Sequence, residues 1–322
     1  MIIVNKAAER KILCVASRGE VWYPINGKEN RNMKNWLKEC RNTVKVGILG
    51  LVMACLLPAS VTVGEAALPA SLSPVGGETV SVYINGVPYA GDAVLYRDST
   101  YVEMGEFTAE AYLCRREVTG DTLTYRGDGL TVTASDGYSW LEANGRYLWC
   151  ESGVFVREEK AYVPIRAAAK AIGARIRWDG EEFAAYVETG GGPITPGDRF
   201  YIEDEVYWLA RIIHAEAGAE PFRGQIAVGN VVLNRVRSKL FPDTIYAVIF
   251  DRKNGVQFTP TVNGMIYRAP DGEAIIAAKL CLEGYSLSHE ILYFLNEALS
   301  ENLWVPRNRP YVMTISGHDF YS

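Results

Sequence analysis

Residues 208–221, WLARIIHAEAGAEP, constrain the fold more than any other segment because they combine a helical apolar stripe with an acidic residue. At 3.6 residues per turn, one face of this helix carries Leu209, Ile212, Ile213 and Glu216. Burial against apolar groups disfavours a charged carboxylate, so the pKa of Glu216 rises and the acid can hold a proton near neutral pH. The glycine and proline that follow end the helix, which puts Glu216 beside a loop.

Two interpretations of this acidic residue compete. A charge on an apolar face is most often paired with an opposite charge, which would make Glu216 a structural residue. Alternatively, its carboxyl group donates a proton to a bound substrate. Residues 225–236, QIAVGNVVLNRV, are apolar enough to form a second, almost wholly buried helix. The region therefore predicts a helical domain with an acid at the end of one helix.

The order of several sequence blocks favours the catalytic interpretation. From about residue 207 to the C-terminus the chain reads HAEAGAEPFRGQIAVGNVVLNRV, FPDTIYAVIF, QFTPTVNG, LYFLN, WVPRNRP and SGHDFY. Together these blocks resemble the SleB-type spore cortex-lytic cell wall hydrolases. The resemblance implies a mainly α-helical, lysozyme-like domain in which Glu216 is the catalytic residue.

The resemblance also indicates the type of reaction. A lytic transglycosylase uses one glutamate, which protonates the glycosidic oxygen and then takes a proton from the 6-hydroxyl of the same muramic residue. A hydrolase usually adds a second carboxylate as nucleophile or base. No obvious second acid is present, because Glu220 lies at the helix break and Asp271 and Glu273 begin another helix. We therefore predict transglycosylation of the bond between N-acetylmuramic acid and N-acetylglucosamine in spore cortex or cell wall.

Seven further residues are predicted to bind the glycan. Aromatic rings can stack on sugars, and amide or hydroxyl groups can bond to sugar hydroxyl and N-acetyl groups. Taken singly, each residue fits core packing or a loop hydrogen bond equally well. The set is Gln225, Gln257, Phe258, Thr259, Tyr293, Asn296 and Trp304. By contrast, Asn230 and Asn234 are expected to satisfy buried backbone groups.

Upstream, residues 79–189 change to short alternating strands separated by turns. The segment contains an internal repeat, because hairpin signals at Asn85-Gly86 and Asn144-Gly145 each precede a strand, a short helix and a strand pair. Residues 162–180, YVPIRAAAKAIGARIRWDG, resemble part of the copper amine oxidase-like N-terminal domain. The segment has no histidine, so copper is not implied. We interpret it as a stalk or wall-interaction module.

These features predict an α+β chain with two domains. A strand-rich, duplicated stalk module at residues 79–189 is followed by a mainly α-helical, lysozyme-like catalytic domain at residues 200–322. The Gly- and Pro-rich sequence GGGPITPG marks a linker at residues 190–199, and residues 67–78 form another.

The N-terminal part predicts export. Residues 33–66 combine a basic start, an uncharged apolar run and small residues, which is the arrangement of a secretory signal peptide. A membrane anchor is the alternative, because the run is near the lower length limit for a span. Residues 1–32 are predicted to be an upstream extension without a fold. The protein is therefore expected outside the cytoplasm, in cell wall or spore cortex, with membrane contact only through an uncleaved N-terminal segment.

Charge and cysteine usage limit the partners. Without residues 1–66, which hold ten Lys or Arg and five Asp or Glu, the chain keeps 23 basic and 33 acidic residues. Such an acidic protein is a poor nucleic-acid binder. The expected partners are peptidoglycan glycan strands and regulatory wall proteins. Cys114 and Cys150 are either a disulfide or two buried thiols.

Other functions remain as alternatives. The first is a wall-binding protein whose catalytic domain is inactive. A zinc amidase is disfavoured because His214, His289 and His318 lack the spacing of zinc ligands. A Cys–His peptidase is disfavoured because Cys281 lies on the apolar stripe of its own helix, which favours an inert thiol. No metal and no cofactor are predicted.

Overall fold

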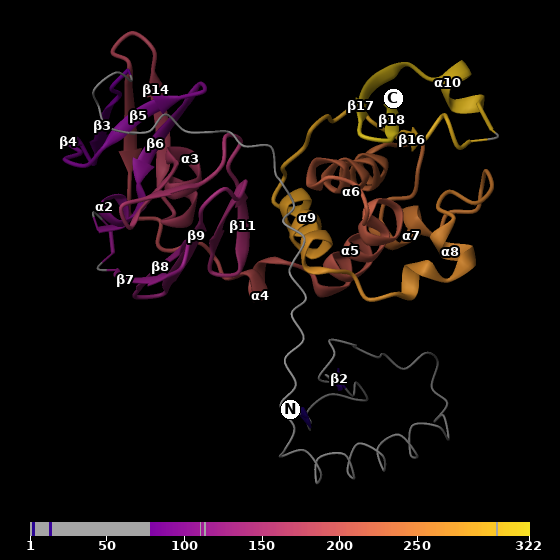
Figure 1. Cartoon of the computed structure of the whole chain (residues 1–322), viewed down its shortest axis with the longest axis horizontal. Coiled ribbons are helices and arrows are strands. Elements are labelled where there is room, and N and C mark those ends of the chain that lie inside the picture. The colour runs from indigo at the N-terminus through magenta and orange to yellow at the C-terminus, as the bar shows by residue number, and fades with distance from the viewer. Residues whose placement is uncertain (1, 4–12, 15–77, 110, 113, 301) are drawn as a thin grey trace. The chain divides into compact units, whose positions relative to one another are not determined.

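The computed structural model describes residues 2–3, 13–14, 78–109, 111–112, 114–300 and 302–322 (Figure 1). The chain divides into two units, Met1–Thr62 and Val63–Ser322. In the first unit, β1 (Ile2–Ile3) and β2 (Leu13–Cys14) pair antiparallel within the extension that was predicted to lack a fold. The rest of that extension, the predicted signal segment and the predicted linker up to residue 77 lie outside the described residues.

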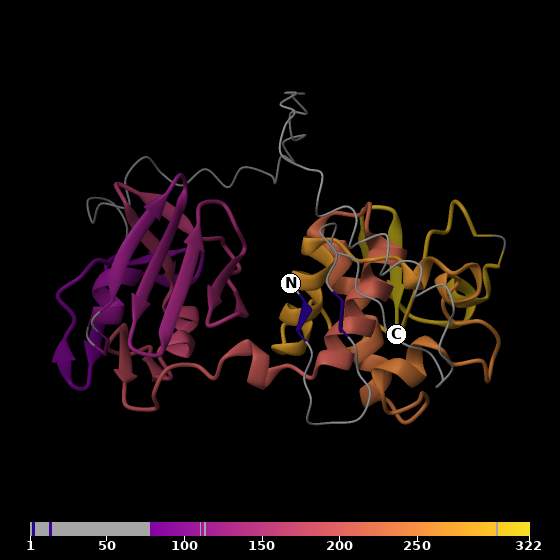
Figure 2. The same cartoon turned by 90° about the horizontal axis from the view of Figure 1, so that it is seen from below.

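The strand-rich module, residues 79–189, contains three sheets, drawn in purple and magenta in Figure 1. Their strand orders are β11-β10-β9-β8-β7, β12-β13-β6-β5 and β14-β15-β3-β4. Figure 2 shows long strands of this module side by side. The strands are β3 (Ser81–Ile84), β4 (Val87–Pro88), β5 (Ala93–Tyr96), β6 (Ser99–Glu103), β7 (Arg115–Thr119), β8 (Thr122–Gly127), β9 (Leu130–Ser135), β10 (Trp140–Ala143), β11 (Arg146–Trp149), β12 (Phe155–Arg157), β13 (Lys160–Pro164), β14 (Arg175–Asp179) and β15 (Ala184–Glu188).

Both predicted hairpins are confirmed. Tight two-residue turns need positive φ at both central residues, which Asn and Gly adopt at low cost. Asn85 and Gly86 have φ of 52° and 80°, and Asn144 and Gly145 have φ of 49° and 78°. The turns join β3 to β4 and β10 to β11.

The two segments that defined the internal repeat lie next to each other. Tyr101-Val102-Glu103 falls in β6, and Tyr162-Val163-Pro164 falls in β13. The two strands pair antiparallel, with Val102 opposite Val163. Each strand runs directly into a short helix, α2 (Met104–Ala109) after β6 and α3 (Ile165–Ala171) after β13. Cys114 and Cys150 are both free thiols, so the disulfide alternative is not formed.

The helical domain, residues 197–322, combines several helices with a small sheet, as the sequence predicted (Figure 1). The second helix, predicted at residues 225–236, lies within α6, which runs from Phe222 to Arg237, and Asp271, predicted to begin another helix, caps the start of α9. The elements are α4 (Gly197–Phe200), α5 (Glu203–Ala217), α6 (Phe222–Arg237), α7 (Ile245–Ile249), α8 (Pro260–Asn263), the 3₁₀ helix η1 (Met265–Tyr267), α9 (Gly272–Leu282), α10 (Trp304–Asn308), β16 (Tyr293–Leu295), β17 (Tyr311–Ile315) and β18 (His318–Tyr321).

Helices α5, α6 and α9 pack on one another and form the core of this domain. Gly229 of α6 lies where the three helices meet. A Cβ atom there would be 2.8 Å from Cys281 Sγ and 2.9 Å from Ile213 Cδ1, so only glycine allows this close approach.

Two buried asparagines hold the segment after α9 against α6. Asn230 Nδ2 donates to the carbonyl of Tyr285 at 3.0 Å, and its Oδ1 accepts from the N–H of Leu287 at 2.8 Å. Asn234 Nδ2 donates to the carbonyls of Ser288 and Ile291. Both residues satisfy backbone groups, as predicted, and they fix the path of the chain into β16.

The C-terminal tail, residues 304–321, mixes proline, glycine and aromatic residues without a helical period. It contains α10, followed by a hairpin of β17 and β18, and β18 pairs with β16 in a three-stranded sheet. The hairpin turns at Ser316, whose φ is 51°. Phe320 and Tyr321 of β18 are buried, so this sheet packs against the helical core.

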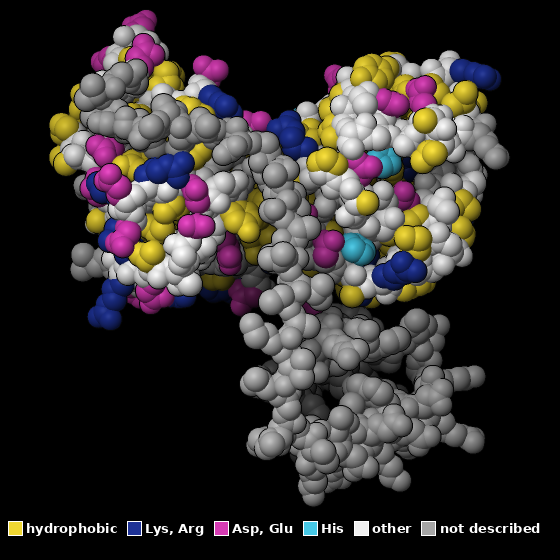
Figure 3. Space-filling model, in the orientation of Figure 1, with side chains coloured by type: hydrophobic (Ala, Val, Ile, Leu, Met, Phe, Trp, Pro, Cys, Tyr) yellow, Lys and Arg dark blue, Asp and Glu magenta, His cyan; other side chains and the backbone are white. Residues whose placement is uncertain are grey.

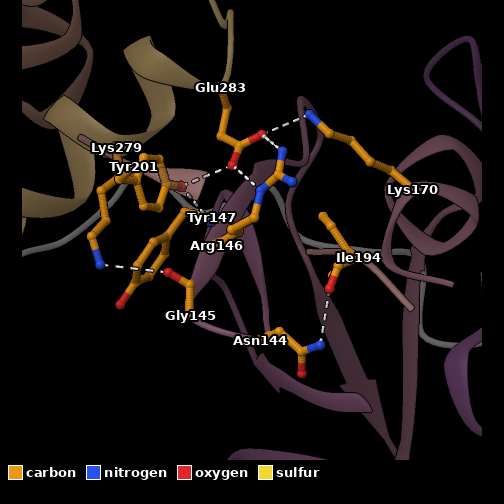
Figure 4. A network of polar contacts seen from close by, with 9 residues as sticks. All are labelled: Asn144, Gly145, Arg146, Tyr147, Lys170, Ile194, Tyr201, Lys279 and Glu283. Carbon is orange, nitrogen blue, oxygen red and sulfur yellow. Dashed lines mark hydrogen bonds and ion pairs between the residues drawn. The ribbon is translucent and has the colours of Figure 1, made fainter. Parts of the chain in front are cut away.

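A polar network joins α9 to the strand-rich module (Figure 4). The side chain of Glu283, directly after α9, is 3% exposed and accepts hydrogen bonds from Arg146 Nε at 2.6 Å and Lys170 Nζ at 2.8 Å. Tyr201 Oη donates to the same carboxylate at 2.9 Å. Burial works to raise the pKa of Glu283, but these hydrogen bonds hold it below its ordinary value.

The segment predicted as a linker at residues 190–199 is part of this junction. Ile194 is buried, and α4 begins at Gly197. The N–H of Gly197 donates to the carbonyl of Asn144 at 2.8 Å, and Asn144 Nδ2 donates to the carbonyl of Ile194 at 3.1 Å. A Cβ on Gly197 would lie 2.5 Å from the carbonyl oxygen of Gly145, so glycine is needed for this contact.

Two surface observations bear on partners. No helix in the described part of the chain is both long and apolar enough to cross a bilayer. On the face drawn in Figure 3, basic side chains lie scattered among acidic ones rather than in one broad patch.

Candidate active site

Glu216 lies in the last turn of α5, at the end of its buried stripe. Leu209, Ile212 and Ile213 on that stripe are fully buried, and Gly218 caps the helix. Burial raises the pKa of Glu216 from an ordinary 4.5 to about 7, and the positive charge of Arg235 opposes that rise. No second carboxylate among the described residues contributes to this shift. An acid with such a pKa is protonated in a large fraction of molecules at neutral pH, as a general acid requires.

Arg235, near the end of α6, is a site residue that the sequence analysis missed. It is 4% exposed, and burial lowers its pKa to about 10. Its Nε donates to the carbonyl of Leu292 at 2.7 Å, and Nη1 donates to Gln257 Oε1 at 3.4 Å. The guanidinium thereby connects α6, the loop after α7 and the start of β16 within electrostatic reach of Glu216.

Three aromatic rings surround this guanidinium. The centroids of Phe241, Phe258 and Tyr293 lie 4.9, 5.1 and 5.5 Å from Arg235 Cζ. A cation is attracted to the electron-rich faces of such rings. The arrangement brings together three predicted site residues, since Gln257, Phe258 and Tyr293 all contact Arg235. Phe258 is 1% exposed, so its ring supports Arg235 and offers no free face for stacking on a sugar.

A second arginine, Arg309, also lies against the ring of Tyr293. Arg309 Cζ lies 4.7 Å from the Tyr293 centroid and 5.4 Å from the ring of Trp304 on α10. Trp304 is 50% exposed, so part of its ring is free for a ligand. The predicted residues Tyr293 and Trp304 therefore share one neighbour in Arg309.

The other predicted binding residues lie in different surroundings. Gln225 is 1% exposed at the start of α6, and its Nε2 donates to the carbonyl of Glu220 at 3.4 Å. Thr259 is exposed directly before α8. Asn296 Oδ1 accepts from the N–H of Ala298 at 3.1 Å and so closes a local turn after β16.

A separate acid–histidine pair lies beside the end of α5. Glu220 Oε1 is 3.5 Å from His318 Nδ1 on β18. His214 lies on α5 outside the stripe that carries Glu216, and its Nδ1 is 3.2 Å from Asp271 Oδ2.

The geometry argues against the thiol alternative. Cys281 is 1% exposed within the helical core, and burial raises its pKa to about 12, so its thiol is a poor nucleophile. Within the described residues, no group of three or more His, Cys, Asp or Glu is placed to hold a metal ion. Cavities of about 270 and 200 Å³ lie in the strand-rich module, and neither includes Glu216.

Family models match two parts of the chain. Residues 219–321 match the cell wall hydrolase family, and residues 83–187 match the copper amine oxidase N-terminal domain. The first match begins three residues after Glu216, so the case for that acid depends on its surroundings and on the sequence blocks.

Curated proteins similar to this chain include two spore cortex-lytic enzymes. The one from Oceanobacillus iheyensis is 34% identical over 133 residues, which is 41% of this chain and 47% of that protein. The one from Bacillus subtilis is 33% identical over 120 residues, which is 37% of this chain and 38% of that protein. The chain therefore spans less than half the length of either relative.

Two solved structures are also similar. The catalytic domain of a germination-specific lytic transglycosylase, SleB from Bacillus anthracis, is 31% identical and covers 40% of this chain and 100% of that domain, with a TM-score of 0.36. The catalytic domain of the Bacillus cereus SleB protein is 32% identical and covers 41% of this chain and 100% of that domain, with a TM-score of 0.35.

Proposed function

We propose that this chain, which through residues 219–321 belongs to the cell wall hydrolase family, cleaves the glycan backbone of peptidoglycan with Glu216 as its acid. The observation that carries the proposal is the burial of this carboxyl group at a helix end, with a pKa raised to about 7. The similar spore cortex-lytic enzymes support spore cortex as the substrate.

The reaction we propose is lytic transglycosylation. Protonated Glu216 donates its proton to the oxygen between N-acetylmuramic acid and N-acetylglucosamine as the bond from C1 of the muramic residue breaks. The carboxylate then takes the proton from the 6-hydroxyl of the same residue, and that oxygen bonds to C1. The products are a 1,6-anhydro end and a new N-acetylglucosamine end, and the enzyme regains its proton. Among the residues that the structure describes, no second carboxylate shifts the pKa of Glu216, which supports this route over hydrolysis.

Arg235 has two effects in this scheme. Its charge favours the ionised form of Glu216, which limits the rise in pKa and assists proton donation to the glycosidic oxygen in the first step. Its hydrogen bonds to Leu292 and Gln257 also fix the backbone and the amide beside the acid. We assign Gln257, Thr259 and Asn296 to hydrogen bonds with the glycan, and Tyr293 and Trp304 to contacts with sugar rings. Buried Phe258 instead packs beside Arg235, and buried Gln225 donates to the carbonyl of Glu220.

The strand-rich module is proposed to be a duplicated stalk that holds the catalytic domain against the wall. Its match to an accessory domain family and the adjacent, similarly continued strands β6 and β13 support this role. We further propose that the helical domain is lysozyme-like and that the protein acts outside the cytoplasm on glycan strands, where wall proteins can regulate it.

The test is release of muropeptides from purified cortex by the full chain. Glu216→Gln should abolish release, while the matched control Asp204→Asn, an exposed change on the same helix, should retain it. Mass spectrometry of the fragments should find 1,6-anhydro ends. Reducing muramic ends would instead establish hydrolysis. Equal release by parent and Glu216→Gln would exclude this acid, and no release by the parent would favour an inactive, wall-binding protein.

A further inference from the structure

Two arginines share the ring of Tyr293 without a carboxylate partner. Arg235 Cζ lies 5.5 Å and Arg309 Cζ 4.7 Å from its centroid. Among the described residues, no Asp or Glu oxygen lies within 4.0 Å of either guanidinium, as an ion pair would require. In a chain with a net charge of −5, this concentration of unpaired positive charge is unexpected.

Arg309 is held in place but its charge is not neutralised. It caps the end of α10, where its N–H donates to the carbonyl of Val305 at 2.9 Å. Its Nε is buried and has no hydrogen-bond partner in the described part of the chain. By contrast, the buried Arg146 makes two hydrogen bonds to Glu283, at 2.6 and 2.7 Å. A half-buried guanidinium without a partner is costly, and an anionic ligand would offset that cost.

The neighbouring rings suit a sugar that carries this anion. Trp304 is 50% and Tyr311 is 58% exposed, so aromatic surface is free beside Arg309. Guanidinium groups bind carboxylates through two parallel hydrogen bonds, and an exposed indole can cover the apolar face of a sugar. In peptidoglycan the carboxylates are carried by the muramic residue, as a free lactyl group or on its peptide stem.

We propose that Arg309, with Tyr293 and Trp304, forms a subsite for a carboxylate on a muramic residue of the bound glycan. Because both arginines lie against the ring of Tyr293, this ring links the subsite to Arg235, whose charge acts on Glu216. This inference rests on the proposed function for the identity of the polymer. It makes the substrate an anionic strand, and it makes Arg309 a specificity-determining residue rather than part of proton transfer.

Three glycan probes separate the sources of the carboxylate. The first is peptide-free strands with free lactyl carboxylates, the second is the same strands with those carboxylates capped as methyl amides, and the third is strands with peptide stems. Binding is measured by calorimetry with the full-length Glu216→Gln protein, so that no cleavage occurs. A lactyl source predicts that the first probe binds about tenfold or more tightly than the second, whereas a stem source predicts this advantage for the third probe alone.

Variants assign the preference to one side chain. Arg309→Gln should abolish the advantage of the anionic probe and leave binding of the capped strands within about twofold. Arg309→Lys should keep a weaker preference, because lysine retains the charge but not the planar fork. The control Arg307→Gln, an exposed change on the same helix, should keep the full preference. Circular dichroism melting curves check that each variant is folded.

The outcomes distinguish this subsite from the proposed activity. The subsite is excluded if all three probes bind equally, or if Arg309→Gln weakens binding of all three probes by the same factor. If the preference depends on Arg309 but the parent protein releases no fragments, the subsite stands and the proposed activity fails. If the parent cleaves all three probes equally well and binds them equally, the activity stands and the subsite fails.

Discussion

The raised pKa of Glu216 predicts that replacing it with glutamine stabilises the protein in alkaline but not in acidic solution. Glutamine resembles the protonated acid in size and charge, so it removes the penalty of holding a carboxylate in an apolar site. The pKa rises from 4.5 in an unrestrained chain to about 7 in the folded protein. At about 1.4 kcal/mol for each tenfold change in proton affinity, the ionised form costs about 3 kcal/mol of folding stability.

The sign of the pH dependence follows from proton binding. Between pH 4.5 and about 7 the folded chain holds the Glu216 proton more tightly than the unfolded chain does. The stability contributed by the protonated acid is therefore complete below pH 4.5 and is lost as the pH rises through about 7. Glu216→Gln should match the parent at pH 4 and exceed it by about 2 to 3 kcal/mol at pH 8.5.

The assay is urea denaturation of the full-length parent and variant, followed by tryptophan fluorescence and repeated from pH 4 to pH 8.5. The control Asp204→Asn, at an exposed position in the first turn of α5, should show no gain of this kind. A difference between parent and Glu216→Gln that does not change with pH would refute the argument that burial raises this pKa. A variant less stable than the parent at pH 8.5 would refute it as well, because it would mean that the ionised Glu216 is well paired.

Three further predictions follow from the same contacts. Arg235→Met should raise the pKa of Glu216 above about 7, because an opposing positive charge is lost. The alkaline limb of the pH profile of kcat/KM should then move to higher pH. An unmoved limb would contradict the electrostatic interaction between Arg235 and Glu216. Glu283→Gln should destabilise the protein by about 3 kcal/mol in thermal or urea unfolding, since it leaves the buried Arg146 without its carboxylate, and this loss should shrink as the pH falls through the lowered pKa of the acid. Gly229→Ala should cost about 1 to 2 kcal/mol in urea unfolding, because its methyl group would meet the Cys281 thiol; an alanine variant as stable as the parent would mean that the helices can separate.

Local sequence rules were sufficient for the helices that carry the acid. The apolar stripe of α5 ends at Glu216, and the observed helix stops one residue later, at Ala217. Periodicity and flanking breakers also located α6 and α9. The hairpin turns at Asn85-Gly86 and Asn144-Gly145 followed from backbone preferences of single residues. Each of these signals depends on a few neighbouring residues, so it can be recognised in a single sequence.

Helix α10 and strands β17 and β18 were not located from the sequence because their signals are not local. Helix α10 has five residues, too few to establish a helical period. Strand β17 has no buried residue, so it shows little of the alternation that marks a half-buried strand. Its pairing depends on β18, which in turn pairs with β16, and such contacts between separate segments leave no pattern within either one.

The same contrast explains why the sequence pointed to Glu216 and not to Arg235. Burial at the end of its own helix is the main cause of the raised pKa of Glu216, and the apolar pattern of residues 208–221 predicts this burial. Arg235, in contrast, looks like any basic residue near a helix end, and its role depends on Leu292 and Gln257, which reach it from other parts of the chain. Changes in β16 or in the loop at Gln257 should therefore shift the pH dependence and substrate preference of the reaction while leaving the identity of its acid unchanged. Acid chemistry and specificity are separable in this domain because the first depends on one helix and the second on contacts among several segments.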